Sequence, residues 1–322
     1  MTTSSLSAKP TSWTDDFGRA WNDFWFRPCD PTLVSLLRIG VGLVALLHLA
    51  SYSSDLVRWF GADSLLPPDT VDALLGGGGT YHPTYLSFAN SPTALWICHA
   101  CGLVAALALT LGFFSRTSAA LTALATLAIT NRAPIISGQV EPVLIFMLLY
   151  LCIAPAGARF SLDAVLRPIL PAQPFANFAH KDEPSISANL SLRLMQVHFA
   201  AFYLMMALAK TYGDAWWDGA AAWHLIAQTH SRPVNLSFLR GNEALRFFLN
   251  AWTHLIAWTQ LLFPFLVWNR FTRPVILAAA ALMWLSLLPL TGLTSFCLLM
   301  LVGLGCFLPA ETFARWHTVA KA

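Results

Sequence analysis

The chain has 322 residues, of which 57% are hydrophobic and 11% are charged. An average soluble protein has about 25% charged residues, so this composition indicates a membrane protein. The formal net charge is +3 and the basic residues stand singly, which excludes the clustered basic surface that binds nucleic acid.

The first 31 residues are polar and lack the basic and apolar regions of a cleavable signal peptide. Four aromatic residues recur there at helical spacing: Trp13, Phe17, Trp21 and Phe24. Ser12 and Asp15 precede most of them in a capping-box pattern. Residues 1–31 are therefore predicted to form a cytoplasmic segment with an amphipathic helix. That helix lies either in the headgroup layer or against the underside of the protein.

Eight segments are apolar and long enough, or nearly so, to cross a bilayer, which takes about twenty residues. They cover approximately residues 32–52, 93–114, 119–136, 140–156, 190–210, 244–268, 274–290 and 292–308. The third is the weakest, because Asn131, Arg132 and Pro134 interrupt it, and it could be shorter or re-entrant. We expect an all-α, polytopic membrane helix bundle over residues 32–309, followed by a cytoplasmic tail over 310–322.

Positive charge in the loops predicts the orientation of the bundle. With the N-terminus inside, eleven Lys and Arg residues fall in the inner segments, and four fall in the outer segments: Arg58, Arg132, Arg232 and Arg240. This bias and the even number of spans predict a multi-pass protein of the cytoplasmic (inner) membrane with both termini in the cytoplasm. Two long outer loops, residues 53–92 and 211–243, are expected to form a lid.

The fifth span carries a polar stripe. At about 100° per residue, Gln196, Tyr203 and Lys210 recur every seventh residue and share one face, while His198 lies about a third of a turn away. A lysine at a helix end can simply snorkel to the interface, but this does not account for the tyrosine and glutamine on its face. Ionisable residues inside a span are functional candidates by default, so this stripe is the main candidate site.

Two further ionisable residues lie near span ends. Arg38, at the inner start of the first span, has either a functional role or a snorkelling one. Glu141, followed by Pro142, is the only carboxylate that enters the membrane region there. It either pairs with Lys210 or is an ordinary helix start.

The remaining candidates lie in and before the sixth span. His254 shares a helix face with Arg246 and Asn250, at spacings of four and eight residues. Trp217 and Asp218 belong to the turn after the fifth span, which could fold back over the end of that helix. All are candidate binding residues.

Cys98 and Cys101 have the spacing of a redox or metal motif, but they lie within an apolar helix and no second pair exists. We interpret this spacing as coincidental. No metal site and no disulfide framework are predicted.

Three stretches of the chain resemble sequences of a known family: "LLRIGVGLVALLHL" at 36–49, "RFSLD" at 159–163 and "YLMMALAKTYGDAWWDG" at 203–219. The third stretch is the most specific. It has a Tyr followed by six residues and a Lys, and then a Trp and a Gly within nine residues of that Lys. Together they resemble the HTTM family, the membrane domain shared by vitamin K-dependent γ-carboxylase and many bacterial proteins. The resemblance extends from about residue 12 to residue 310.

In the carboxylase, the lysine of this motif deprotonates vitamin K hydroquinone. The resemblance therefore implies that Lys210 is a base, with Tyr203 and His198 orienting a quinone such as vitamin K hydroquinone or menaquinol. A base must be uncharged, which burial away from water favours. The chain departs from the carboxylase at Trp284 and near Glu141, which align with two active-site histidines.

Three functions stay open on this basis. The first is a quinol-dependent carboxylase-like enzyme or oxidoreductase, and the second is a non-catalytic accessory protein that binds an envelope or redox partner. The third is a transporter, for which no inverted repeat or broken helix pair is found. The expected partners are the lipid bilayer and an isoprenoid quinone, and no nucleic acid is expected.

Overall fold

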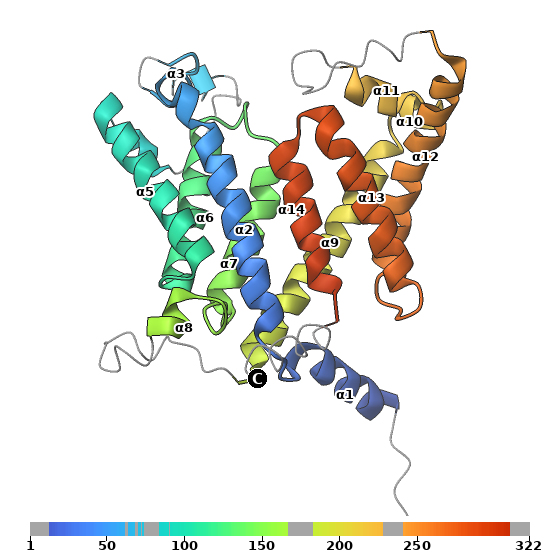
Figure 1. Cartoon of the computed structure of the whole chain (residues 1–322), viewed down its shortest axis with the longest axis horizontal. Helices are drawn as coiled ribbons and strands as arrows, with labels where there is room; N and C mark the ends of the chain where they lie inside the picture. The colour runs from blue at the N-terminus through green and yellow to red at the C-terminus, as the bar shows by residue number, and fades with distance from the viewer. Residues whose placement is uncertain are drawn as a thin grey trace, which may run out of the picture.

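The structure is a computed structural model that describes residues 13–61, 64–67, 70, 71, 73, 84–89, 91–166, 183–227 and 241–309. Within these ranges the chain is helical and contains no strand, apart from an isolated bridge between Cys29 and Ser185. Most of the long helices lie side by side and run between the same two ends of the molecule (Figure 1). The expected all-α architecture is therefore confirmed.

A helix of the described residues coincides with each of the eight expected spans. These helices are α2 (Thr32–Ser51), α5 (Pro92–Leu111), α6 (Ser115–Arg132), α7 (Val140–Ile153), α9 (Ile186–Lys210), α12 (Glu243–Leu266), α13 (Arg273–Thr291) and α14 (Thr294–Leu304).

Four helical segments in the described part of the chain are long and apolar enough to cross a membrane: α2 with its continuation to Phe60, α5, α9 and α13. The apolar helix α7 is shorter, and so is α14 together with η5 (Gly305–Phe307). Helices α6 and α12 have 18 and 24 residues but carry more polar side chains. The four long segments indicate a membrane protein.

Helix α6 is continuous, although its expected segment was the weakest of the eight. It begins four residues earlier than expected and ends at Arg132, because Pro134 disfavours helical conformation in the preceding residue. The Arg132 side chain is buried and folds against the turn that follows α3 (Leu56–Phe60), where it donates to the carbonyls of Gly61 and Leu66.

Short helices from the two long loops lie at one end of the bundle. Helix α3 comes from the first loop, and α10 (Asp214–Trp217) and α11 (Ala221–Ile226) come from the second; all three are at the upper end in Figure 1. Helix α8 (Leu162–Leu166) and helix α1 (Trp13–Phe26) lie at the opposite end.

Small residues let the long helices approach one another closely. A Cβ on Gly42 of α2 would lie 2.9 Å from the backbone nitrogen of Thr110 in α5. A Cβ on Gly303 of α14 would lie 1.7 Å from the Phe199 ring of α9. Such contacts are typical of helix packing in membranes, where close van der Waals contact replaces the hydrophobic effect.

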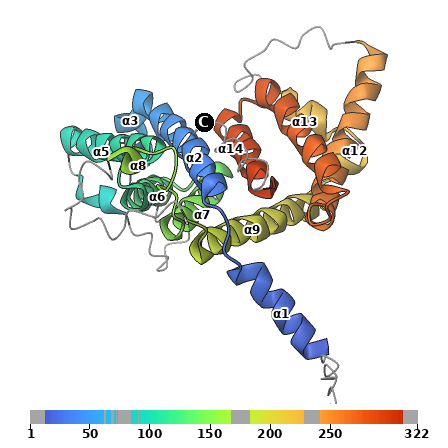
Figure 2. The same cartoon turned by 60° about the horizontal axis from the view of Figure 1, so that its bottom comes forward.

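Helix α1 extends away from the bundle (Figure 2). Its rings stack in the order Trp13, Phe17, Trp21 and Trp25, with centroids 5.8–6.3 Å apart, so Trp25 takes the place expected for Phe24. Phe24 instead lies under the Arg193 guanidinium of α9. Only this end of α1 is fixed to the bundle, since Trp13, Phe17 and Trp21 are exposed.

Candidate functional site

The polar stripe of α9 lies on one side of the helix, as its spacing predicts. Gln196 and Tyr203 are buried, and Lys210 is half-buried at the C-terminal end of α9. All three face other parts of the chain and not the surroundings. The structure therefore brings these three predicted residues onto one interior face.

Both polar atoms of the Gln196 side-chain amide form hydrogen bonds. Its Nε2 donates to the Cys306 carbonyl at 2.7 Å, and its Oε1 accepts from Arg193 at 2.8 Å. Arg193 also donates to the Phe24 carbonyl at 3.2 Å. Gln196 thus connects α9 to η5 and, through Arg193, to α1.

Tyr203 is the most enclosed residue of the stripe, with 0% of its surface exposed. Its hydroxyl accepts a 2.6 Å hydrogen bond from Trp284 Nε1, and its ring stacks on Phe263 at a centroid distance of 3.9 Å. Trp284, on α13, therefore contacts the tyrosine of the polar stripe. This contact joins α9 to α13 and α12.

Lys210 ends α9 beneath an indole ring. Its Nζ donates to the Met206 carbonyl at 3.1 Å and lies 4.7 Å from the centroid of the Trp216 ring. Among the residues that the structure describes, no carboxylate lies within ion-pair distance of this amine. A cation at a helix C-terminus and over an indole face is stabilised by both.

The turn after Lys210 does fold back over it, but through a neighbouring residue. Trp216 covers the amine, whereas Trp217 is 66% exposed and donates through Nε1 to the Thr211 carbonyl. The Asp218 side chain is exposed, and its main-chain oxygen accepts from Asn250 of α12. The sequence indicated that Trp216, Trp217 and Asp218 could fold back over Lys210, but it did not decide between the two adjacent tryptophans, because that choice depends on the turn at Gly213.

His198 lies on the other side of α9, away from the stripe. Its side chain is exposed, and Nδ1 lies 2.8 Å from the Tyr150 hydroxyl of α7. The Phe146 ring is 5.1 Å away. The structure therefore does not bring His198 together with Tyr203 and Lys210.

His254 is half-buried in α12, and Arg246 near the start of the same helix is exposed. Asn250, between them, binds the Asp218 carbonyl. This face of α12 thus supports the turn after α9. Among the described residues, no side chain of this face forms a hydrogen bond or ion pair with the Lys210 amine.

Glu141 belongs to a buried polar group that the sequence did not reveal. Its Oε1 accepts from the Tyr52 hydroxyl at 2.9 Å and lies 3.4 Å from His48 Nε2, while Oε2 accepts from the Gly138 nitrogen at 2.8 Å. Its partner is therefore α2 and not Lys210. His48 is in the last turn of α2 and Glu141 in the first turn of α7, so this polar group joins the end of one helix to the start of the other.

Arg38 is fully buried and does not snorkel to water. Its guanidinium donates to four backbone carbonyls: Leu109 at 2.6 Å, Thr110 at 2.9 Å, Ala156 at 3.0 Å and Phe160 at 2.5 Å. These carbonyls belong to the end of α5 and to the turn before α8. Arg38 thus connects α2 to the end of α5 and to the turn before α8.

The stretch "RFSLD" at 159–163 completes this junction. Asp163 accepts from the backbone nitrogens of Phe114 and Ser115 at 2.8 and 3.0 Å, and so caps the start of α6. The stretches 36–49 and 159–163 therefore hold this end of α2, α5 and α6 together, and only the stretch 203–219 contributes to the stripe.

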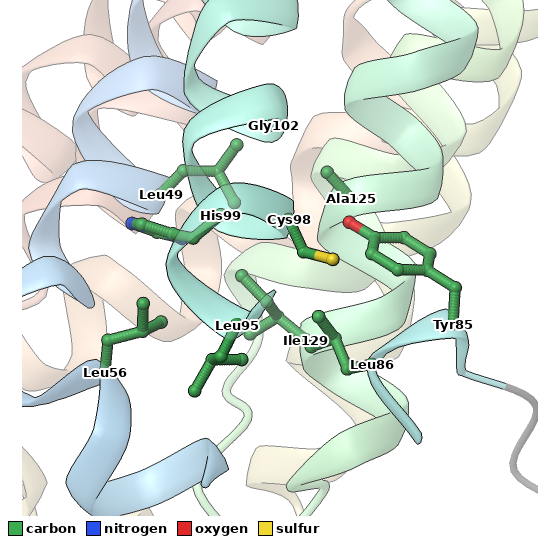
Figure 3. Close-up of a pocket in the computed structure, with 10 residues that line it drawn as sticks. All are labelled: Leu49, Leu56, Tyr85, Leu86, Leu95, Cys98, His99, Gly102, Ala125 and Ile129. Atoms are coloured by element: carbon green, nitrogen blue, oxygen red, sulfur yellow. The ribbon is translucent and has the colours of Figure 1, made fainter. Parts of the chain in front are cut away.

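A small pocket lies among α2, α5, α6 and the short helix η2 (Tyr85–Phe88), as Figure 3 shows. Its interior accommodates about 10 Å³, the order of a single water molecule. The Cys98 sulfur points toward the Tyr85 hydroxyl, and His99 is bonded to Ser53 at 2.9 Å. Burial, together with the nearby Cys98, raises the pKa of Tyr85 to about 12.

The described residues contain no group of three or more His, Cys, Asp or Glu that could hold a metal ion. Comparison with known proteins gives no match: no protein-family model fits the chain, and no curated protein and no solved structure is similar to it.

Proposed function

We propose that the chain is a multi-pass protein of the cytoplasmic (inner) membrane with an HTTM-like architecture, and that it binds an isoprenoid quinone beside Lys210. In this proposal, eight helices span the membrane, both termini are cytoplasmic, and the loops that carry α3, α10 and α11 form the outer lid. Support comes from the eight helices at the expected positions and from the loop charge.

One observation carries the ligand proposal: the Lys210 amine lies under Trp216 and faces no carboxylate within the described ranges. An amine that is half-enclosed by an indole and an apolar helix end can donate to a quinone carbonyl. In its neutral form it can instead take the proton of a hydroquinone hydroxyl. A few polar groups in an otherwise apolar bundle are the usual composition of a small-molecule site.

The ligand is tested by purification into lipid nanodiscs, solvent extraction and mass spectrometry. We expect an isoprenoid quinone at a higher ratio to protein than in protein-free nanodiscs from the same membranes, and at least a tenfold loss of this excess in Lys210→Met. Arg58→Met is the matched control, because it removes a positive charge from an exposed outer position. No excess in the wild-type chain, or equal excess in Lys210→Met, would contradict the proposal.

A second candidate function is a non-catalytic accessory protein, and a separate observation favours it. The hydroxyl of Tyr203 and the amide of Gln196 are already occupied by Trp284, Cys306 and Arg193. Lys210→Arg separates the two functions, because arginine keeps the charge but cannot accept a proton. If the chain is an enzyme, the wild-type protein should consume oxygen in the presence of a hydroquinone and Lys210→Arg should not. If the chain is an accessory protein, neither protein should consume oxygen, and Lys210→Arg should retain its quinone.

Orientation is tested with single-cysteine variants in intact cells. A cysteine that replaces the exposed Tyr212 should react with a membrane-impermeant thiol reagent from outside. A cysteine that replaces the exposed Asn22 should react only after the membrane is permeabilised. Labelling of both positions from the same side would contradict the proposed span count, and α6 would be the first helix to reassess.

A further inference from the structure

His198 is the middle residue of a long apolar helix and faces outward. Helix α9 has 25 residues, so His198 is about 18 Å along the axis from either end. Its side chain is exposed, and α9 is one of the helices long and apolar enough to cross a membrane. An ionisable residue at such a depth normally faces the bundle interior or a water-filled cavity. The outward orientation of the His198 side chain therefore needs an explanation.

The chain provides good hydrogen-bond partners for only one of the two imidazole nitrogens. Its Nδ1 lies 2.8 Å from the Tyr150 hydroxyl and 3.3 Å from the Leu194 carbonyl. Its Nε2 lies 3.4 Å from the Tyr150 hydroxyl, a longer contact. If Tyr150 donates to Nδ1, then Nε2 carries the proton and is a donor. If Nδ1 carries the proton, then Nε2 is an acceptor. Either way, one polar atom faces lipid, where an unsatisfied polar group is costly.

Aromatic and apolar side chains lie beside this imidazole. The rings of Phe146 and Tyr150 lie 5.1 and 5.3 Å from the imidazole, centroid to centroid. The same two helices carry further exposed large apolar side chains, among them Leu149 and Ile153 on α7, and Val197 and Met205 on α9. Side chains of this size hinder the close approach of another helix backbone, whereas aromatic rings provide a stacking surface for a flat ligand.

We infer that the surface around His198 and Tyr150, between α7 and α9, is a lateral binding site for a membrane-soluble molecule that carries a hydrogen-bonding oxygen on a flat ring. A ring carbonyl accepts from Nε2–H in one tautomer, and a ring hydroxyl donates to Nε2 in the other. A quinone and its quinol therefore both fit, with the apolar tail in the lipid.

This site is distinct from the outer end of α9. His198 is twelve residues from Lys210 and lies on the other side of the helix from Tyr203. The choice of a quinone as the probe rests on the proposed function, whereas the site itself rests on the geometry of the His198–Tyr150 pair.

The test uses the full chain in nanodiscs with a photoreactive short-chain azidoquinone, followed by mapping of the labelled peptides. We expect labelling within residues 143–153 and 194–205, at least a tenfold loss in His198→Phe and a smaller loss in Tyr150→Phe. Leu282→Phe, on an exposed position of α13, is the control and should label like the wild-type chain. Thermal unfolding of each variant confirms that it is folded, and unchanged labelling in a folded His198→Phe overturns the site.

The remaining outcomes separate this site from the proposed function. Labelling confined to residues 206–217 supports binding at Lys210 and overturns the lateral site. Lateral labelling that is lost in His198→Phe but unchanged in Lys210→Met supports the lateral site alone. Displacement of the label by added phospholipid, but not by unlabelled quinone, overturns the requirement for a ring. Loss of a dimer from native mass spectra of His198→Phe assigns the surface to a second copy of the chain and overturns the ligand.

Discussion

The guanidinium of Arg38 lies beside the space that a side chain at Gly112 would fill. A Cβ on Gly112 would be 2.5 Å from Arg38 Nη1 and 2.4 Å from the Ser161 Cβ. Gly112 also has a φ of +74°, in the left-handed region that favours glycine. The junction of α2, α5 and α6 around Arg38 therefore depends on a residue without a side chain.

We expect Gly112→Ala to lower the stability of the chain in detergent by more than the left-handed conformation alone costs, which is about 1–2 kcal/mol. Gly241→Ala is the matched control, because Gly241 has a φ of +83° and no heavy atom within 4 Å of its Cβ position. Tryptophan fluorescence during thermal unfolding measures both variants. Equal losses would show that Arg38 and Ser161 move aside freely.

The hydrogen bond between Trp284 and Tyr203 should be measurable as a coupling energy. Tyr203→Phe leaves the buried Nε1–H of Trp284 without its acceptor, and Trp284→Phe leaves the tyrosine hydroxyl without its donor. A double-mutant cycle should therefore give a coupling of about 1 kcal/mol. The unfolding free energies of the four proteins give this value.

The control cycle combines Tyr203→Phe with Tyr150→Phe, whose hydroxyl bonds to His198 on the other face of α9. These two changes should be additive. If the Tyr203–Trp284 cycle is also additive, the tyrosine hydroxyl has another partner in solution. A ligand beside the stripe would then be the first candidate.

Sequence reasoning predicted the helices well because each depends on local features. Runs of apolar residues marked all eight long helices, and the 100° periodicity correctly placed Gln196, Tyr203 and Lys210 on one face. The end of α6 was expected near residue 136 but lies at Arg132, two residues before Pro134. These features need no knowledge of which helix lies beside which.

The partners of the polar residues could not be predicted, because they depend on tertiary packing. Glu141 bonds to Tyr52, which is 89 residues away in sequence, and Arg38 bonds to carbonyls 71–122 residues away. Backbone carbonyls have no sequence signature. A partial signal existed for Tyr52, since it follows His48 by four residues and therefore lies on the same face of its helix.

We expect Glu141→Ala to destabilise the chain strongly, by about 3 kcal/mol, since it leaves the Tyr52 hydroxyl and Gly138 nitrogen without their acceptor beside a buried histidine. Glu141→Gln should cost less, because it keeps one acceptor oxygen and the shape of the side chain. Unfolding in detergent measures both. Glu243→Ala is the control: it is also in a first helical turn but is exposed, and it should change stability by less than about 0.5 kcal/mol.

Cys29 offers a pH-dependent test of the packing of the end of α1 against α9. Its backbone pairs with Ser185, and burial, with a smaller contribution from Asp30, raises the pKa of its thiol to about 11. Because the thiolate is the reactive form, its alkylation rate should rise about tenfold per pH unit and continue to rise above pH 9. An ordinary thiol would level off near its pKa of about 8.5.

The measurement uses a variant in which Cys29 is the only cysteine, with iodoacetamide as the reagent. The control carries Asn22→Cys in a Cys29→Ser background, at an exposed position of α1, and should level off about two units lower. Asn189→Ala removes the bonds from α9 to the Phe24 and Trp25 carbonyls and should move the Cys29 profile toward that of the control. A Cys29 profile identical to the control in the unaltered chain would mean that the end of α1 is not packed against α9, and that its aromatic stack is free to reorient.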